Sequence, residues 1–180
     1  EDKKAIKARA FEVDRKARFK KGSGFPLRIP VIEMVEIGAG GGSIARVNKL
    51  EQIITGPDSA GSVPGPACYS NGGTLPTITD ADLVIGKINP ENFAGGKIKL
   101  SKDLAADAIT KNISQIVNLD MDTAALAISE IVDETMSNAA RVHTVEQGHE
   151  TSSRTLIAFG GAAPLHVARV AEKLKVSSII

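Results

Sequence analysis

The chain has 180 residues, of which 42% are hydrophobic, 24% are charged and 3% are aromatic. This composition is typical of a globular protein and excludes the disordered and fibrous classes, and the length suits one domain of about 100 to 200 residues. A net charge of +1 excludes a nucleic-acid partner that is bound mainly through charge. Because aromatic residues are scarce, we expect a core of Val, Ile, Leu and Ala, which suits an α/β protein.

A single cysteine, Cys68, excludes an internal disulfide and a cysteine-based metal site. No apolar run approaches the roughly 18 residues that span a bilayer, and no apolar stretch of the signal-peptide kind follows the N-terminal charges. We therefore expect a cytoplasmic protein with no membrane partner.

Residues 1–22 are strongly charged, with nine of the 22 Lys and Arg residues of the chain before Gly22. Acidic residues interrupt this run, so the pattern predicts a solvated helix or linker rather than a binding arm. The glycines at 22 and 24 end it, and Pro26 and Pro30 favour an extended path. We expect the folded domain to cover residues 23–180.

The run IPVIEMVEI at 29–37 is mostly apolar and predicts a strand that leads into the glycine-rich sequence GAGGGS. Two short segments, 43–48 and 51–55, then favour a hairpin over a helix. The stretch 56–73 is so rich in Gly and Pro that it predicts a long irregular loop, either ordered and functional or disordered.

Helical patterns follow. Thr79 is the expected N-cap of a short helix over 79–86, with Asp82 at its third position. Ser101 is the expected cap of a second helix, whose apolar residues repeat every three or four positions up to Ile116. A long Ala-rich helix is predicted over 122–147, with Gly148 as its stop.

The C-terminal part predicts a βαβ pattern. A buried strand over 155–159 precedes a Gly-Gly turn, a helix over 164–175 begins with a proline, and 176–180 reads as another strand. A chain that stops within a strand indicates a piece of a longer protein.

The glycine run after the first strand is the first candidate site. Gly38, Gly40, Gly41 and Gly42 allow backbone amides to approach phosphate oxygens, and Ser43 follows them. A dinucleotide-binding fingerprint fails here because Ser43 replaces its last glycine and a hairpin follows. A glycine-rich hairpin without a ligand stays open as the alternative.

The sequence FGGAAPLH at 159–166 is the second candidate site. A Gly-Gly turn before a helix N-terminus allows close backbone approach to a nucleotide, although a simple tight turn is the alternative. His166 is a ligand, a proton donor or a packed neutral histidine, of which packing is favoured.

Other reactive side chains receive structural interpretations. Cys68 is interpreted as a buried structural thiol rather than a nucleophile. Asp80 and Asp82 are interpreted as helix caps rather than cation ligands, and His143 and His149 are assigned no site.

Four segments in this order resemble the hydantoinase A and 5-oxoprolinase family, which includes acetone and acetophenone carboxylase subunits. They are IEMVEIGAGGGSIA, GPDSAGSVPGPACY, GGTLPTITDADLVIG and AFGGAAPLHVA. The resemblance implies an α/β actin-like ATPase (ribonuclease H-like) fold with a mixed sheet and packed helices. Two halves of that fold clamp ATP, and this chain corresponds to one half.

The resemblance also implies site residues and cofactors, namely ATP and Mg²⁺. Glu36 would be catalytic, near the magnesium ion or its water, and no metal ligand is assigned. The cofactor-binding residues it implies are Gly38, Gly40, Gly41, Gly42, Ser43, Gly160, Gly161, Ala162 and Pro164. The chain departs from the family at Ala163, where a small residue with positive φ would favour glycine.

The implied chemistry is ATP-dependent opening of a cyclic amide, and the alternative is carboxylation of a ketone by an ATPase subunit. A non-catalytic fragment that at most binds nucleotide or a partner subunit is the third possibility, because the first phosphate loop of the family is missing. We expect this chain alone to be inactive, and the whole protein to form a homo-oligomer or a complex with a hydantoinase B-type subunit.

Overall fold

The computed structural model describes residues 7–8, 11–13, 16, 22–32 and 34–180. The chain divides into two compact units, residues 1–37 and residues 38–180. In the first unit, β1 (Lys7–Ala8) pairs antiparallel with β4 (Val31–Ile32), and β2 (Phe11–Val13) pairs antiparallel with β3 (Phe25–Leu27).

The predicted helix over residues 1–22 is wrong where the structure describes this segment. Phe11 and Val13 alternate with Glu12 in a strand, and they pair with Leu27 and Phe25. Pairing supplies ladder hydrogen bonds that override a weak helix propensity. Residues 1–6, 9–10, 14–15 and 17–21 lie outside the described part of this prediction.

The predicted strand over 29–37 is shorter than expected. Its described residues contain β4, and 34–37 have no regular structure. The partner strand β1 also has two residues, and a strand extends only as far as its partner does. Glu33 lies outside the described residues.

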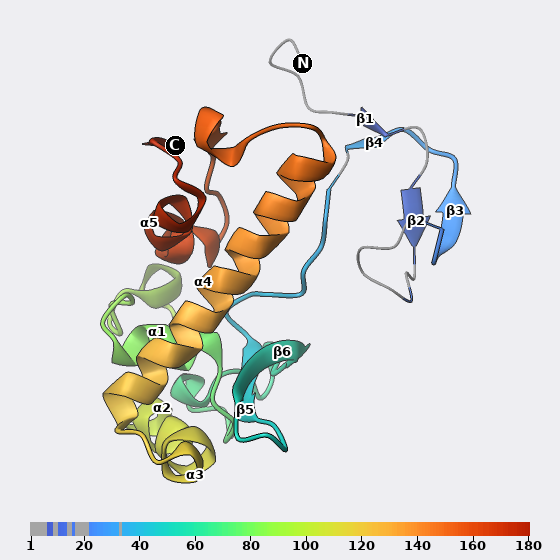
Figure 1. The fold of residues 1–180 in the computed structure, drawn as a ribbon. Coiled ribbons are helices and arrows are strands. Elements are labelled where there is room, and N and C mark those ends of the chain that lie inside the picture. The colour runs from blue at the N-terminus through green and yellow to red at the C-terminus, as the bar shows by residue number, and fades with distance from the viewer. Residues whose placement is uncertain (1–6, 9–10, 14–15, 17–21, 33) are drawn as a thin grey trace. The chain divides into compact units, whose positions relative to one another are not determined.

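The second unit begins with the predicted hairpin, which is confirmed. Strands β5 (Ser43–Val47) and β6 (Ile53–Ser59) pair antiparallel, with a bulge between Ser43 and Ala45. In the turn, the side-chain oxygen of Asn48 accepts hydrogen bonds from the amides of Leu50 and Gln52. The hairpin lies beside the N-terminal half of α4 in Figure 1.

The α-helices are the main regular elements of the second unit. They are α1 (Ile78–Val84), α2 (Lys102–Ile109), α3 (Gln115–Val117), α4 (Met121–Glu146) and α5 (Ala163–Leu174). A π-helical turn, Thr110–Ser114, joins α2 to α3. The predicted cap Ser101 and the stop at Gly148, with φ of 73°, are both confirmed.

The predicted cap of α1 is wrong by two residues. Thr77 is the N-cap, and its hydroxyl accepts a hydrogen bond from the amide of Asp80. The carboxylate of Asp80 accepts a hydrogen bond from the amide of Thr77 at 2.8 Å, which completes a capping box. Both Thr residues have the chemistry of a cap, and the tertiary structure selects the one that Asp80 can reach.

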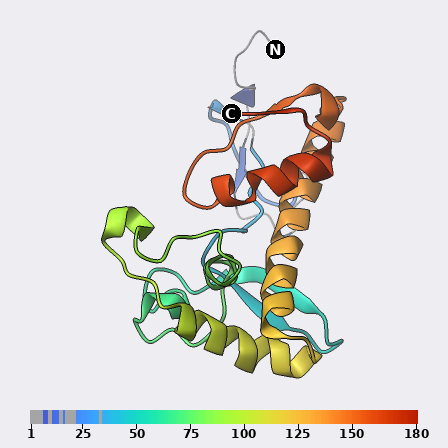
Figure 2. The same ribbon diagram turned by 90° about the vertical axis from the view of Figure 1, so that its left-hand side faces the viewer.

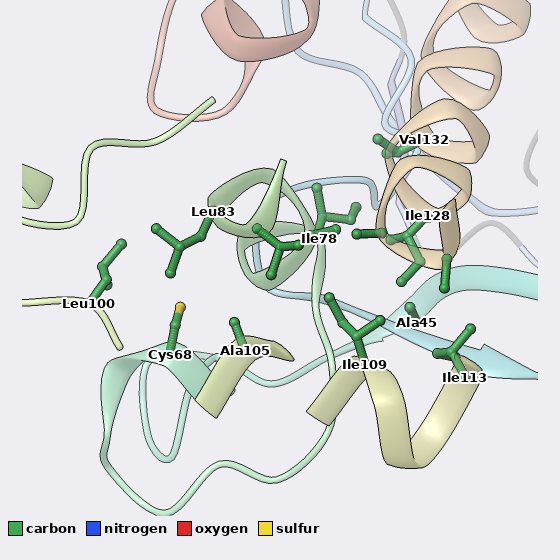
Figure 3. Close-up of a cluster of buried hydrophobic side chains, with 14 residues drawn as sticks. Ala45, Cys68, Ile78, Leu83, Leu100, Ala105, Ile109, Ile113, Ile128 and Val132 are labelled. Carbon is green, nitrogen blue, oxygen red and sulfur yellow. The ribbon is translucent and has the colours of Figure 1, made fainter. Parts of the chain in front are cut away.

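Helix α1 lies at the centre of the apolar core, and all its residues are buried. Figure 3 shows Ile78 and Leu83 of α1 surrounded by side chains of α2, α4, β5 and the loop that contains Cys68. Ile109 from α2 and Ile128 from α4 are fully buried there. Burial of such a side chain contributes about 1.5 to 3 kcal/mol each, so this cluster is a main source of stability.

The C-terminal βαβ pattern is confirmed, with a difference in extent. Strand β7 (Thr155–Leu156) pairs parallel with β8 (Ser178–Ile179), and α5 connects them. The predicted buried strand over 155–159 ends after Leu156, and Ile157 and Phe159 are 65% and 81% exposed. Parallel strands are buried when layers of structure cover both faces of their sheet. Within the described residues, this pair of strands lacks such covering layers.

The strands of the described residues form four separate pairs, three antiparallel and one parallel, instead of the expected mixed sheet. The chain is therefore α/β with small sheets and packed helices. Within the same residues, no helix combines the length and the apolar character that a membrane crossing requires.

The loop over 56–73 has a defined conformation. Strand β6 continues into it as far as Ser59, and a 3₁₀ turn covers Ala67–Tyr69. The carboxylate of Asp80 accepts hydrogen bonds from the amides of Ala67 and Cys68 at 3.2 and 2.8 Å. Since Asp80 also accepts from the amide and hydroxyl of Thr77, four donors converge on one buried carboxylate. Asp80 therefore anchors the loop to the start of α1.

Replacement of Asp80 by Asn tests this anchor. The amide nitrogen of Asn would face donors in place of one acceptor oxygen, so Asp80→Asn should lower the free energy of unfolding by about 3 kcal/mol. Urea denaturation measures the change. Asp107→Asn is the matched control, because Asp107 is exposed and pairs with Lys111 on the surface, and it should change stability by less than about 0.5 kcal/mol. Equal effects of the two substitutions would contradict the anchoring role.

Candidate functional site

The glycine run forms a tight turn immediately before β5. The amide of Ser43 donates to the carbonyl of Gly40 at 2.9 Å. The hydroxyl of Ser43 accepts from the amide of Gly40 at 3.1 Å and donates to the carbonyl of Gly38 at 3.3 Å. The buried hydroxyl of Ser43 therefore holds the turn together.

Gly41 and Gly42 pack this turn against its neighbours. The carbonyl of Gly41 accepts from the amide of Thr79 at 2.9 Å, and a Cβ on Gly41 would lie 2.5 Å from the hydroxyl oxygen of Thr79. A Cβ on Gly42 would lie 2.9 Å from the hydroxyl oxygen of Ser59. Glycine at both positions thus allows close packing on α1 and β6, although a Cβ on Gly42 would displace only the end of the Ser59 side chain.

The amides of Gly41 and Gly42 donate to no protein acceptor in the described part of the chain. Successive free backbone amides in a turn form a concave anion-binding surface. These two amides are therefore available as backbone donors to a ligand.

The second predicted site is the turn before α5. Gly160 has φ of 96°, and Gly160 and Gly161 are both exposed. Ala162 is the N-cap and provides no side-chain hydrogen bond, and Pro164 lies in the first turn of the helix. An uncapped N-terminus leaves backbone donors and the positive end of the helix dipole exposed.

Ala163 does not carry the expected energetic cost. It lies in α5, and it is not among the residues with positive φ. The departure from glycine at this position therefore causes no backbone strain.

Glu36 belongs to the first unit, where it is exposed. The glycine turn and the Gly160–Gly161 turn both belong to the second unit. The catalytic role that the family resemblance implies for Glu36 stays a prediction.

A buried polar cluster between three helices was not predicted from the sequence. The Nδ1 atom of His166 in α5 lies 2.7 Å from Oδ1 of Asp133 in α4, and its Nε2 atom lies 3.1 Å from Oδ2 of Asp82 in α1. All three side chains are 1 to 2% exposed. The first contact has hydrogen-bond geometry, whereas the second is close enough for an ion pair but poorly aligned for a hydrogen bond.

Lys87 and Ser129 complete the cluster. The Nζ atom of Lys87 donates to the hydroxyl of Ser129 at 2.8 Å, and that hydroxyl donates to Asp82 at 3.2 Å. The same Nζ lies 3.5 Å from Asp82 and 3.9 Å from Asp133. With a protonated His166, two positive and two negative charges balance.

The pKa of His166 reflects these neighbours. Burial alone lowers the pKa of the imidazole, but the hydrogen bond with Asp133, the close contact with Asp82 and the charges of both carboxylates outweigh burial and raise the pKa to about 9. His166 is therefore an imidazolium near neutral pH. It is packed, as expected, but as a charged group rather than a neutral one.

One sequence signal could have located this cluster. Ser129, Asp133 and Ser137 recur every four residues in α4, and all three are buried. This spacing places a polar stripe on one side of a helix whose adjacent side is apolar. Such a stripe indicates that polar partners face it across the interior.

The remaining predicted side chains have structural roles. Cys68 is buried, and burial together with the charge of Asp80 raises the pKa of its thiol far above the usual range, so it stays protonated. Asp80 is a cap as expected, whereas Asp82 pairs with His166. Across the described ranges, no group of three or more His, Cys, Asp or Glu residues could hold a metal ion.

The raised pKa of His166 predicts a pH-dependent stability. Because the pKa rises from 6.5 to about 9 on folding, the stabilisation is complete below pH 6.5 and is lost as the pH rises through 9. Its size is about 3 kcal/mol. Urea denaturation from pH 6 to pH 10 should show this decline in the wild-type chain and in His149→Gln, which alters an exposed histidine. In His166→Gln the decline should be absent, and a parallel decline there would exclude His166 as its source.

Several known proteins are similar to this chain in sequence and in fold. The model of the hydantoinase/oxoprolinase family matches residues 2–180. The gamma subunit of acetophenone carboxylase from Aromatoleum aromaticum is 43% identical over 79% of this chain and 20% of that protein. The alpha subunit of caprolactamase from Pseudomonas jessenii is 38% identical over 88% of this chain and 23% of that protein.

A solved structure has a similar fold. The crystal structure of the ATP-dependent caprolactamase from Pseudomonas jessenii matches with a TM-score of 0.81 and 35% identity, over 92% of this chain and 23% of that chain. The chain thus spans less than a quarter of the length of these relatives. Since the family model covers nearly all of its residues, the chain belongs to the hydantoinase/oxoprolinase family.

Proposed function

We propose that this chain is the ATP-binding part of a hydantoinase- or oxoprolinase-type hydrolase that opens a cyclic amide at the expense of ATP. The observation that carries the proposal is the pair of free amides of Gly41 and Gly42 in a turn packed against α1. Two adjacent donors without protein acceptors suit the oxygens of one phosphate group. The similarity to an ATP-dependent caprolactamase supports ATP as the source of that phosphate.

The turn before α5 extends the proposed site. Gly160 and Gly161 carry no side chain that would obstruct a nucleotide, and a Cβ on Gly161 would meet no atom within 4 Å. The uncapped first turn of α5, with Ala162 and Pro164, favours a polar or negatively charged group. We assign this turn to the adenosine side, in the manner of an actin-like ATPase.

The chemistry follows from these assignments. The amide oxygen would attack the γ-phosphorus of ATP and release ADP. Water would then add to the activated amide carbon, the ring nitrogen would leave with a proton to give an acyl phosphate, and a second water would release phosphate. The amides of Gly41 and Gly42 would stabilise the charge on the transferring group, and Ser43 would keep both amides in position through its bonds to Gly38 and Gly40. Glu36 is the carboxylate proposed to lie near Mg²⁺, which needs one or two protein carboxylates besides phosphate and water.

A ketone carboxylase is the second candidate. The 43% identity to the gamma subunit of acetophenone carboxylase favours this candidate. The motifs of the proposed ATP site are common to both kinds of enzyme, so they do not distinguish the two reactions. Both named relatives are subunits, which supports a complex with a second subunit, proposed here to be of the hydantoinase B type. A homo-oligomer is the alternative assembly, and the cytoplasm is the proposed location. A non-catalytic role in nucleotide or partner binding is the third candidate, since the chain covers a fifth to a quarter of its relatives.

Calorimetric titration with Mg-ATP tests the phosphate turn. We expect the wild-type chain to bind and Gly41→Asp to lose binding at least about tenfold, because a carboxylate would oppose the phosphate charge. Asn71→Asp is the matched control, since it adds the same charge at an exposed loop position. If Gly41→Asp unfolds, Gly42→Asp replaces it, because its Cβ meets the movable hydroxyl of Ser59. Retained binding in the folded variant would contradict the assignment of the turn.

The reaction is tested by measuring phosphate release from ATP with each class of substrate. Phosphate release that depends on a cyclic amide supports the hydrolase, whereas release that depends on a ketone with bicarbonate supports the carboxylase. Nucleotide binding without either release supports the non-catalytic role.

A further inference from the structure

A continuous buried path joins the glycine turn to the turn before α5. The carbonyl of Gly41 bonds to the amide of Thr79, which lies three residues before Asp82 in α1. Asp82 contacts His166 at 3.1 Å, and His166 lies four residues after Ala162. A helix rises about 1.5 Å per residue. Thr79 therefore lies about 5 Å along α1 from Asp82, and Ala162 lies about 6 Å along α5 from His166.

The path is rigid because it consists of helix and buried side chains. Thr79, Asp82 and His166 are 6%, 1% and 1% exposed. The capping box of Thr77 and Asp80 fixes the first turn of α1, at which the glycine turn is attached. Figure 2 shows α5 lying across α4, so that His166 also meets Asp133 from that helix.

Charged groups face His166 from every helix that packs around it. Asp82 comes from α1 and Asp133 from α4, while Lys87 follows α1. On the surface, α5 and α4 are joined by further ion pairs, Arg169 with Glu130 and Lys173 with Glu130 and Glu134. Exposed pairs contribute little. The buried contact of His166 with Asp82 is a specific connection between α5 and α1.

We propose that His166 is a positioning residue that fixes the Gly160–Gly161 turn relative to the glycine turn, so that both turns engage one nucleotide. The inference rests on the proposed function. Because His166 is buried, it would act on the nucleotide indirectly, through α5 and through Asp82 of α1. A ligand that contacts two preformed elements binds more tightly because less freedom is lost on binding.

The imidazolium form is required for this role. A protonated imidazole has two N–H groups, one that donates to Asp133 and one that faces Asp82 in an ion pair, whereas a neutral imidazole has one. Loss of the proton therefore releases one of the two carboxylates and leaves the cluster with a net negative charge. With a pKa of about 9, the positioning is complete at neutral pH and is lost above pH 9.

Hydrogen exchange without nucleotide tests the connection directly. In His166→Gln, two peptides should exchange about tenfold faster than in the wild-type chain, because the two turns lose their common support. One contains the hydrogen-bonded amide of Leu165 at the start of α5, and the other contains the hydrogen-bonded amides of Gly40 and Ser43 in the glycine turn. His149→Gln, at an exposed site, should leave both peptides unchanged. Asp133→Asn serves as a second variant if His166→Gln fails to fold. Unchanged exchange in the folded variant would overturn the inference.

Mg-ATP titration then tests the consequence for binding. We expect Kd to rise about tenfold in folded His166→Gln, and in the wild-type chain to rise as the pH passes 9. In Asp133→Asn, the pKa of His166 falls, so the rise in Kd should move to lower pH. A purely structural role would lower stability but leave the Kd of the folded fraction and this midpoint unchanged. If the wild-type chain does not bind Mg-ATP, the proposed function fails, and hydrogen exchange still decides whether His166 couples the two turns.

Discussion

The buried contacts of His166 with Asp82 and Asp133 join three helices that come from distant parts of the sequence. Buried charges are tolerated when each has a partner, and removal of one partner leaves an uncompensated charge that costs about 3 to 5 kcal/mol. Lys87 balances the second carboxylate and reaches the cluster from a partly exposed position. This requirement for charge balance fixes the relative positions of α1, α4 and α5. The position of the turn before α5 follows from the position of that helix.

Helix α1 connects this polar cluster to the rest of the second unit. In its first turn, the amide of Thr79 donates a hydrogen bond to the glycine turn, and Asp80 accepts a hydrogen bond from the loop at Cys68. One turn later, Asp82 forms an ion pair with His166. Ile78 and Leu83 pack in the apolar core. One short helix thus organises the hairpin, the long loop and α5, which explains why none of its residues is exposed.

The glycine turn has two requirements that the sequence alone does not separate. Gly41 and Gly42 are needed because side chains would collide with Thr79 and Ser59, and their free amides are also available to an anion. A short glycine motif is therefore weak evidence of phosphate binding by itself. The proposal of ATP binding draws on the free amides together with the family, whose named members include a carboxylase subunit and a caprolactamase subunit.

Local signals in the sequence determined the hairpin, the helices α2, α4 and α5, the cap at Ser101, the stop at Gly148 and the buried state of Cys68. Each depends on residues within one or two turns of each other, where periodicity and capping act. The family also followed from the sequence, because several motifs occur in a fixed order.

The tertiary structure decided the features that depend on distant partners. Strand lengths in the first unit and at β7 follow from the strands with which they pair. Thr77 rather than Thr79 caps α1 because Asp80 is held by the distant amides of Ala67 and Cys68, whereas Asp82 pairs with His166. The cluster of Asp82, Asp133 and His166 spans more than 80 positions of the chain. No local pattern brings these residues together, because ion pairing acts through space and only packing of the three helices closes the distance.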